Sequence, residues 1–149
     1  MYRASRAVVP AFAPDERLYL RYAAQHFLNG QLLPDGIRAQ LKQSVNRGLF
    51  SEPEDVLFSP SGEYNGLGVV EFQVLDIPTR IVQEQGPPYV FFTKHEPYDD
   101  NYAHSEIWAN HDPPTSAGFR RPSRTISLNF RVALCIRINL DRVRIEAAR

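Results

Sequence analysis

Three apolar segments in the middle of the chain constrain the fold more than any other feature. Residues 68–77 alternate, with Val70, Phe72 and Val74 on one side and mostly polar residues between them. Residues 102–109 also alternate, and residues 89–93 form a short apolar run. A period of two is typical of strands with one buried face, whereas a continuous apolar run predicts a central strand covered on both faces. Proline- and glycine-rich turn segments separate these strands, which favours an antiparallel sheet.

The flanking regions carry the helical signals. Residues 35–46 place Ile37, Leu41 and Val45 four apart, which predicts a helix. Residues 17–22 and 124–138 fit either a helical or an extended period, so both alternatives stay open there. We therefore expect an α+β fold in which an antiparallel sheet carries two or three helices.

The chain length favours a single domain. At 149 residues the chain can bury roughly two thirds of its unfolded surface without a disulfide or a metal. We expect one domain over residues 1–149, with residues 1–14 as a flexible or packing N-terminal arm. No segment reaches the ~18 apolar residues of a membrane span. The apolar run within the first ten residues is too short for a signal peptide. We expect a cytoplasmic protein without a membrane partner.

The single cysteine limits the chemistry. Cys135 has no partner for an internal disulfide or a cysteine-based zinc site. It lies within the apolar run 132–136, where a buried thiol behaves as a small hydrophobic side chain. We interpret it as structural.

Charge is segregated along the chain although its net value is zero. Residues 51–119 contain two basic and twelve acidic residues, whereas residues 120–149 contain eight arginines and two acidic residues. This pattern predicts packing of basic ends around an acidic middle, or a basic face for an acidic partner. The whole-chain balance does not favour a nucleic-acid partner. The arginines that we single out for binding are Arg120, Arg121 and Arg124.

One segment, residues 94–108, concentrates the residues with chemical potential. If residues 102–109 form a strand, its period places His104 and Glu106 on one face. His95 ends the preceding strand, so it would lie beside His104 if the two strands pair. The candidate catalytic residues are therefore His95, His104 and Glu106. The turn between the strands adds the candidate binding residues Asp99, Asp100 and Asn101.

Three interpretations of this segment stay open. The two imidazoles can act as a general acid and base without a metal, as in some RNA-cleaving enzymes. His104 and Glu106, with His95 or Asp100, can instead bind a divalent metal. The third interpretation is structural, because Asp and Asn favour turns through bonds to the local backbone. The spacing matches no strong metal motif, so we expect no metal and no cofactor.

Other catalytic patterns are weaker. Neither a phosphate-binding glycine loop nor a Gly-x-Ser-x-Gly elbow is present in the sequence. An Arg–Ser–Glu arrangement, as in ADP-ribosyltransferases, can be drawn from Arg21, Ser44 and Glu106. The Glu-x-Glu pair often seen in that class is missing here.

Several short blocks resemble a family of small, functionally uncharacterised bacterial proteins. The blocks occur in order over most of the chain, at residues 18–21, 33–34, 44–47, 68–72, 95–107 and 130–134. The resemblance implies a bacterial, cytoplasmic, one-domain protein and carries no activity with it.

Two hypotheses for function follow. The first is a non-enzymatic protein that acts through contact with another protein or with itself, as an accessory component of a defence or toxin-type system. The alternative is a small hydrolase, most plausibly a ribonuclease, that uses His95, His104 and Glu106.

Overall fold

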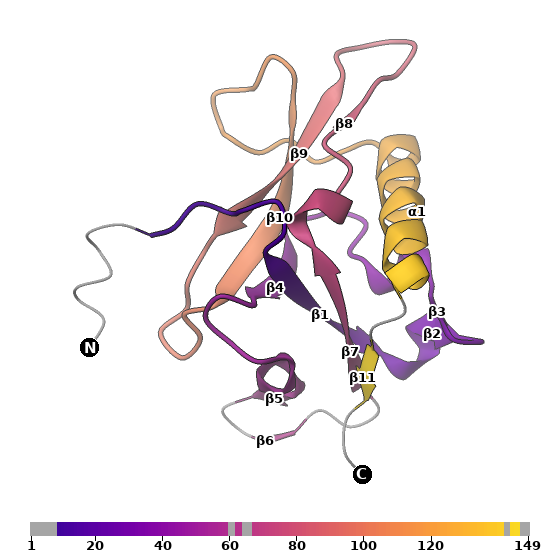
Figure 1. Ribbon diagram of the computed structural model, residues 1–149. Helices are drawn as coiled ribbons and strands as arrows, with labels where there is room; N and C mark the ends of the chain where they lie inside the picture. The colour runs from indigo at the N-terminus through magenta and orange to yellow at the C-terminus, as the bar shows by residue number, and fades with distance from the viewer. Residues whose placement is uncertain (1–8, 60–61, 64–66, 142–143, 147–149) are drawn as a thin grey trace.

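A seven-stranded antiparallel sheet with one α-helix on one face forms the body of the molecule (Figure 1). The computed structural model describes residues 9–59, 62–63, 67–141 and 144–146. The strand order is β11-β7-β1-β4-β10-β9-β8. Its strands are β1 (Arg17–Ala23), β4 (Gln43–Arg47), β7 (Leu67–Gln73), β8 (Arg80–Ile81), β9 (Tyr89–His95), β10 (His104–His111) and β11 (Arg144–Glu146).

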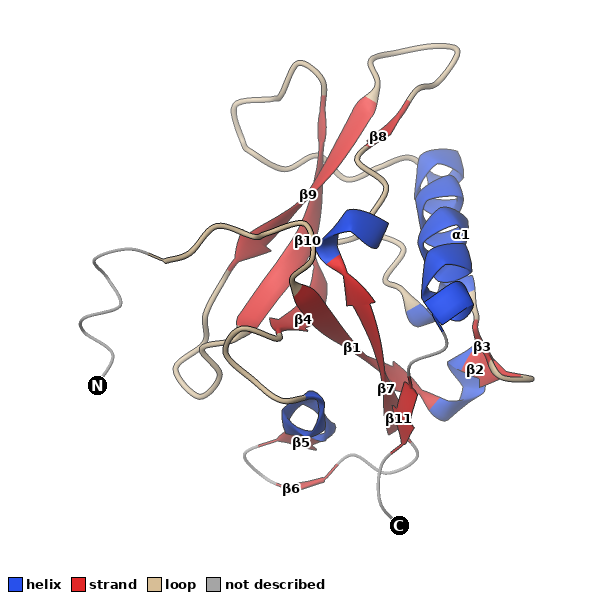
Figure 2. Cartoon of the chain, viewed as in Figure 1, coloured by secondary structure: helices blue, strands red, loops and turns tan. Residues whose placement is uncertain are grey.

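The remaining elements are short, apart from the helix α1 (Arg124–Asp141) (Figure 2). Two small hairpins pair β2 (Phe27–Leu28) with β3 (Gln31–Leu32) and β5 (Phe58–Ser59) with β6 (Gly62–Glu63). Four 3₁₀ turns complete the described chain: η2 (Ala24–His26), η3 (Pro34–Gly36), η4 (Pro53–Leu57) and η5 (Val74–Asp76). The α+β class and its antiparallel sheet are confirmed, but the described residues contain one α-helix rather than two or three.

The helix predicted over residues 35–46 is wrong. The chain there forms η3, a turn and then the strand β4, although Ile37, Leu41 and Val45 are all buried. Leu41 and Lys42 adopt left-handed backbone conformations, with φ of 60° and 50°. These conformations break any helix and redirect the chain into the sheet, so the spacing of four reflects burial at three separate points.

The two ambiguous segments resolve in opposite ways. Residues 17–22 lie in β1, because Leu18, Leu20 and Tyr22 all point into the core with a period of two. Residues 124–138 lie in α1, where Ile126, Phe130, Leu134 and Ile138 recur every four residues and are at most 2% exposed. Burial of one face thus decides between the two periods.

The three predicted strands are present with shifted ends. The strand expected over 68–77 stops at Gln73, where a reciprocal pair of bonds between Gln73 and Asp76 caps η5. The strand at 89–93 was expected to be covered on both faces, but Phe92 is 37% exposed. The reason is that α1 covers only one face of the sheet, so that alternate residues of β9 face outward.

The main core lies between α1 and this covered face. Phe91 of β9 stacks on Phe130 of α1 with ring centroids 4.2 Å apart. A second, smaller core lies on the opposite face, where η4 packs Leu57 against Tyr19 and Val69. We call this opposite face the open face. No helix within the described residues combines the length and the apolar character that crossing a membrane requires.

The N-terminal arm predicted over residues 1–14 is described from residue 9 onward. The buried guanidinium of Arg47 forms two bonds of 2.7 Å with the carboxylate of Glu16. It also donates to the backbone carbonyls of Pro10 and Ala11 and lies 3.9 Å from the centre of the Phe12 ring. Residues 10–16 are therefore attached to the end of β4.

Candidate functional site

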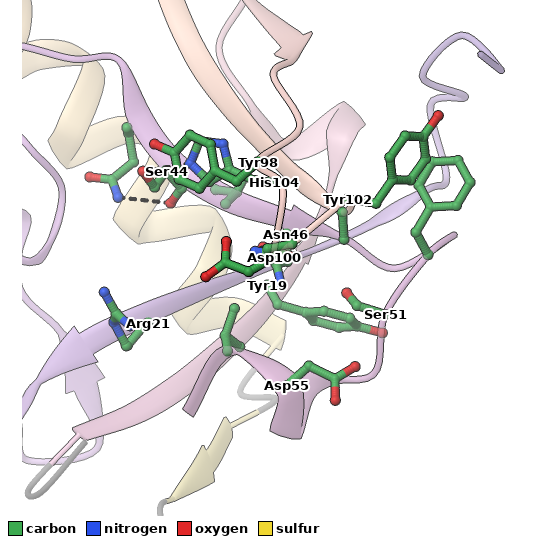
Figure 3. A pocket seen from close by; sticks show the side chains of 16 residues that line it. Tyr19, Arg21, Ser44, Asn46, Ser51, Asp55, Tyr98, Asp100, Tyr102 and His104 are labelled. Carbon is green, nitrogen blue, oxygen red and sulfur yellow. Dashed lines mark hydrogen bonds between the residues drawn. The ribbon is translucent and has the colours of Figure 1, made fainter. Parts of the chain in front are cut away.

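A pocket of about 820 Å³ lies on the open face of the sheet (Figure 3). Its floor is formed by β1, β4 and the first residue of β10, and its walls by η4 and the turn at residues 97–102. Floor residues include Tyr19, Arg21, Ser44, Asn46 and His104; wall residues include Ser51, Asp55, Tyr98, Asp100, Asn101 and Tyr102. The volume falls within the range of small-molecule sites.

The pairing of β9 with β10 separates the two predicted catalytic histidines. The strands pair as expected, but His95 lies opposite Ser105 rather than opposite His104. Because paired residues share a face and neighbours alternate, His95 faces the covered side and His104 the open face. The expectation that the two imidazoles lie beside each other is therefore wrong by one residue of register.

His104 is held from both ring nitrogens. Its Nδ1 lies 2.6 Å from the carbonyl oxygen of Glu96, which can only accept, so Nδ1 carries a proton. Its Nε2 lies 3.1 Å from the hydroxyl of Ser44, which can donate to it when the imidazole is neutral. The ring is 4% exposed and Tyr98 stacks on it at 3.7 Å between centroids. His104 is thus fixed in the pocket floor, with Nε2 bonded to Ser44.

Glu106 lies directly behind this imidazole. One carboxylate oxygen accepts a bond of 2.9 Å from the indole of Trp108, and the other is 4.0 Å from Nε2 of His104. Its side chain is 16% exposed. The ammonium groups of Lys42 and Lys94 lie 4.4 and 4.1 Å from the centre of the Trp108 ring. The carboxylate is therefore fixed in direction and has cationic neighbours.

Arg21, Ser44 and Glu106 belong to three neighbouring strands of the sheet, β1, β4 and β10. Glu106 pairs with Ser44 across β10 and β4. β1 and β4 pair at Leu18 with Arg47 and at Tyr19 with Asn46, and this pairing ends before it reaches Arg21 and Ser44. Arg21 and Ser44 both line the pocket (Figure 3). Ser44 and Glu106 are thus direct neighbours, and Arg21 shares the pocket lining with Ser44, whereas Glu106 is not among the lining residues.

His95 occupies a different environment. Its ring packs against Tyr102 at 4.8 Å and against Phe50 at 5.7 Å between centroids. Nδ1 lies 3.3 Å from the Ser105 hydroxyl, while Nε2 is buried and has no hydrogen-bond partner within the described structure. Burial lowers the pKa of His95, and the nearby Arg47 guanidinium lowers it further. A neutral, packed imidazole is the consequence.

The two groups of predicted binding residues lie at different places. Asn101 and Asp100 line the pocket, and Asn101 donates a bond of 2.8 Å to the side-chain oxygen of Asn46. Asp99 lies in the same turn and is exposed. The three arginines Arg120, Arg121 and Arg124 lie instead beside the N-terminus of α1, where the Arg120 amide bonds to Ala109 near the far end of β10.

Two further residue types bear on the chemistry. Tyr19 on the pocket floor keeps its phenol protonated, because burial raises its pKa and Glu52 adds to that effect. Cys135 is buried against the helix-covered face, and burial raises the pKa of its thiol to about 12. Among the described residues, no group of three acidic, histidine or cysteine side chains is arranged to hold a metal ion.

Sequence reasoning missed most of the aromatic lining, namely Tyr19, Phe50 and Tyr98. Tyr19 was detectable as the outward member of the alternating segment 17–22. Tyr98 belongs to the turn, whose path no periodicity describes. Tyr102 was expected to begin the strand over residues 102–109, but it lies in the turn because β10 begins at His104. No protein-family model matches the chain, and no curated protein or solved structure matches it either.

Proposed function

We propose that this protein cleaves the glycosidic bond of a nicotinamide dinucleotide and transfers the ADP-ribosyl group to water or to an acceptor. The observations that support the proposal are the pairing of Ser44 with Glu106 across β4 and β10 and the presence of Arg21 and Ser44 in the lining of one pocket. These residue types are the ones that make up the Arg–Ser–Glu arrangement of ADP-ribosyltransferases. His104, two residues before Glu106, stands where the first carboxylate of a Glu-x-Glu pair would be.

The carboxylate of Glu106 suits the charge that develops in this reaction. When the bond between the ribose C1′ and the pyridine nitrogen breaks, its electron pair leaves with nicotinamide and the ribose becomes an oxocarbenium ion. Glycosidases stabilise such a cation with a carboxylate. Glu106 supplies one whose direction is already fixed by Trp108, which avoids reorganisation during the reaction.

The proton of the attacking group has an acceptor nearby. Water or an acceptor hydroxyl forms the new bond to C1′ and loses a proton. His104 Nε2 lies between the Ser44 hydroxyl at 3.1 Å and the Glu106 carboxylate at 4.0 Å. Because the Ser44 hydroxyl donates to Nε2, the released proton would pass to the Ser44 oxygen while Ser44 transfers its own proton to Nε2.

The pocket lining suits the rest of a dinucleotide. Arg21 provides a guanidinium for phosphate oxygens, which it can bind in a bidentate manner. Tyr98 is 53% exposed and offers a ring on which a planar base can stack. The carboxylates of Asp55 and Asp100 favour the positively charged pyridinium of the oxidised nicotinamide through charge attraction.

The two-imidazole ribonuclease mechanism needs both rings on one face. Since His95 lies on the other face, we do not base a proposal on it. The toxin-type context remains part of our proposal, because an enzyme that consumes a central dinucleotide is harmful unless a partner restrains it.

Nicotinamide release tests the proposal directly. Purified protein is incubated with NAD, and free nicotinamide is measured by chromatography, with binding of NAD followed separately by calorimetry. We expect Glu106→Gln to lower release at least 100-fold while NAD still binds, and Arg21→Gln to weaken binding. Glu71→Gln is the matched control, because Glu71 also lies next to β1 but pairs with Arg17.

Two outcomes contradict the proposal. Protein that neither binds NAD nor releases nicotinamide excludes it, and so does unchanged release by Glu106→Gln. A loss of activity in Ser44→Ala alone, with full activity in Glu106→Gln, would instead indicate that Ser44 is a nucleophile activated by His104.

A further inference from the structure

The helix α1 is apolar on both sides, although the sheet covers only one. Its inner side packs into the main core. Its outer side carries Leu128, Val132, Ile136 and Leu140, which are 47%, 39%, 56% and 72% exposed. In Figures 1 and 2, α1 lies at the outside of the molecule with the sheet on one side. We call these four residues the outer stripe.

A helix that is hydrophobic all round is typical of a helix buried on all sides. The four residues of the outer stripe follow one another at intervals of four, so they form one continuous band along most of the 18-residue helix. Helix-in-groove recognition uses the same kind of spacing, in which apolar side chains three or four residues apart act together. The outer stripe is therefore suited to a second helix.

The charges around the outer stripe indicate what kind of helix would bind there. Residues 124–140 include no acidic residue, and the exposed charges of this part of α1 are Arg124 and Arg137. Arg120 and Arg121, also exposed, precede the helix. Three arginines thus gather at the end where the helix dipole is already positive, and the first turn lacks an acidic residue. A second copy of α1 would bring mainly more arginines to this surface, with Asp141 at its end as its one acidic residue.

We propose that the outer stripe binds an acidic amphipathic helix of another protein. Leucine-like side chains of that helix would pack between Leu128 and Leu140. Its carboxylates would pair with Arg137 on one flank and with Arg120, Arg121 and Arg124 at the N-terminal end of α1. The surface lies on the helix side of the sheet, away from the pocket, so this inference does not depend on the proposed function.

Two designed peptides test the partner chemistry. The first is a fluorescently labelled 20-residue helix with leucine at alternating three- and four-residue intervals and glutamate on both flanks. The second has lysine in place of every glutamate. We expect the acidic peptide to bind, as measured by fluorescence anisotropy, and the basic peptide to bind at least tenfold more weakly. Added salt should weaken the acidic peptide's binding.

A double variant tests the surface. Ile136→Gln with Leu140→Gln changes two exposed side chains, and circular dichroism checks that the helix is retained. We expect at least tenfold weaker binding of the acidic peptide. Val82→Gln is the matched control, because Val82 is 66% exposed and lies outside α1; it should change binding less than twofold.

The inference is overturned if the acidic peptide does not bind, if both peptides bind equally, or if the double variant binds as well as Val82→Gln. It is also overturned if light scattering shows a dimer that the double variant dissociates. That result would assign the outer stripe to a second copy of this chain.

Discussion

The ion pair between Arg47 and Glu16 allows a stability prediction with a matched control. The Arg47 side chain is fully buried and that of Glu16 is 8% exposed. Glu16→Gln removes the negative charge and leaves a buried guanidinium. Breaking a buried pair in this way costs ~3–5 kcal/mol. We expect the lower end, about 3 kcal/mol, because the carbonyls of Pro10 and Ala11 still accept bonds from Arg47.

The control is the second Arg–Glu pair, between Arg17 and Glu71. Its arginine side chain is 58% exposed, and exposed pairs contribute about 0–1 kcal/mol. A loss of about 3 kcal/mol in a chain of this size lowers the melting temperature by roughly 6–12 °C. Urea unfolding followed by circular dichroism measures both variants against the unmodified protein.

The reasoning fails if Glu16→Gln and Glu71→Gln destabilise the protein equally, or if Glu16→Gln costs less than about 1 kcal/mol, the range of an exposed pair. Either result would mean that water reaches the Arg47 guanidinium. The slope of the urea transition distinguishes this from a change in the unfolded state, because that slope follows the surface exposed on unfolding.

Three further predictions concern His95, Cys135 and Gly48. The pKa of His95 is lowered in the folded state, so its contribution to stability is complete above the unfolded value of 6.5 and is lost as the pH falls from there toward the folded pKa. The free energy of unfolding should therefore change more between pH 7.5 and pH 5.5 in the unmodified protein than in His95→Gln. An equal change in the two proteins would contradict this. With a pKa of about 12, the Cys135 thiol should resist iodoacetamide at pH 8 until urea unfolds the protein, and rapid labelling of folded protein would show that it is accessible. Gly48→Ala should cost ~1–3 kcal/mol in urea unfolding, because the new Cβ would lie 2.9 Å from the carbonyl oxygen of Arg17; an unchanged midpoint would show that the backbone can shift there.

Periodicity predicted the sheet wherever one face alone is buried. Val70 and Phe72 alternate with the less buried Glu71 and Gln73 and lie in β7 as expected, although Val69 before them is also buried, in the second core. The same reasoning failed at residues 35–46, because apolar spacing cannot reveal the left-handed conformations of Leu41 and Lys42. It was undecided at residues 124–138 because the outer stripe adds apolar residues to the exposed side of α1. Periodicity indicates which face of an element is buried, and this indication is weaker for a helix that is apolar on two sides.

The candidate site was predictable only in part, since its geometry depends on register between strands distant in sequence. The period of β10 correctly placed His104 and Glu106 on one face. Nothing in the sequence fixes whether His95 lies opposite residue 104 or 105, although this single step decides which face it occupies. The neighbour of Glu106 on β4 is Ser44, which lies 62 positions earlier in the sequence, and only the pairing of the strands reveals it.

The pocket combines a floor and walls of different origin. Its floor belongs to strands that have a neighbour on each side, whereas its walls are a turn and a 3₁₀ segment. Admission of a ligand and the reaction it undergoes can therefore vary separately. Substitutions at residues 97–102 would change which molecules enter, while the groups that act on them keep their alignment.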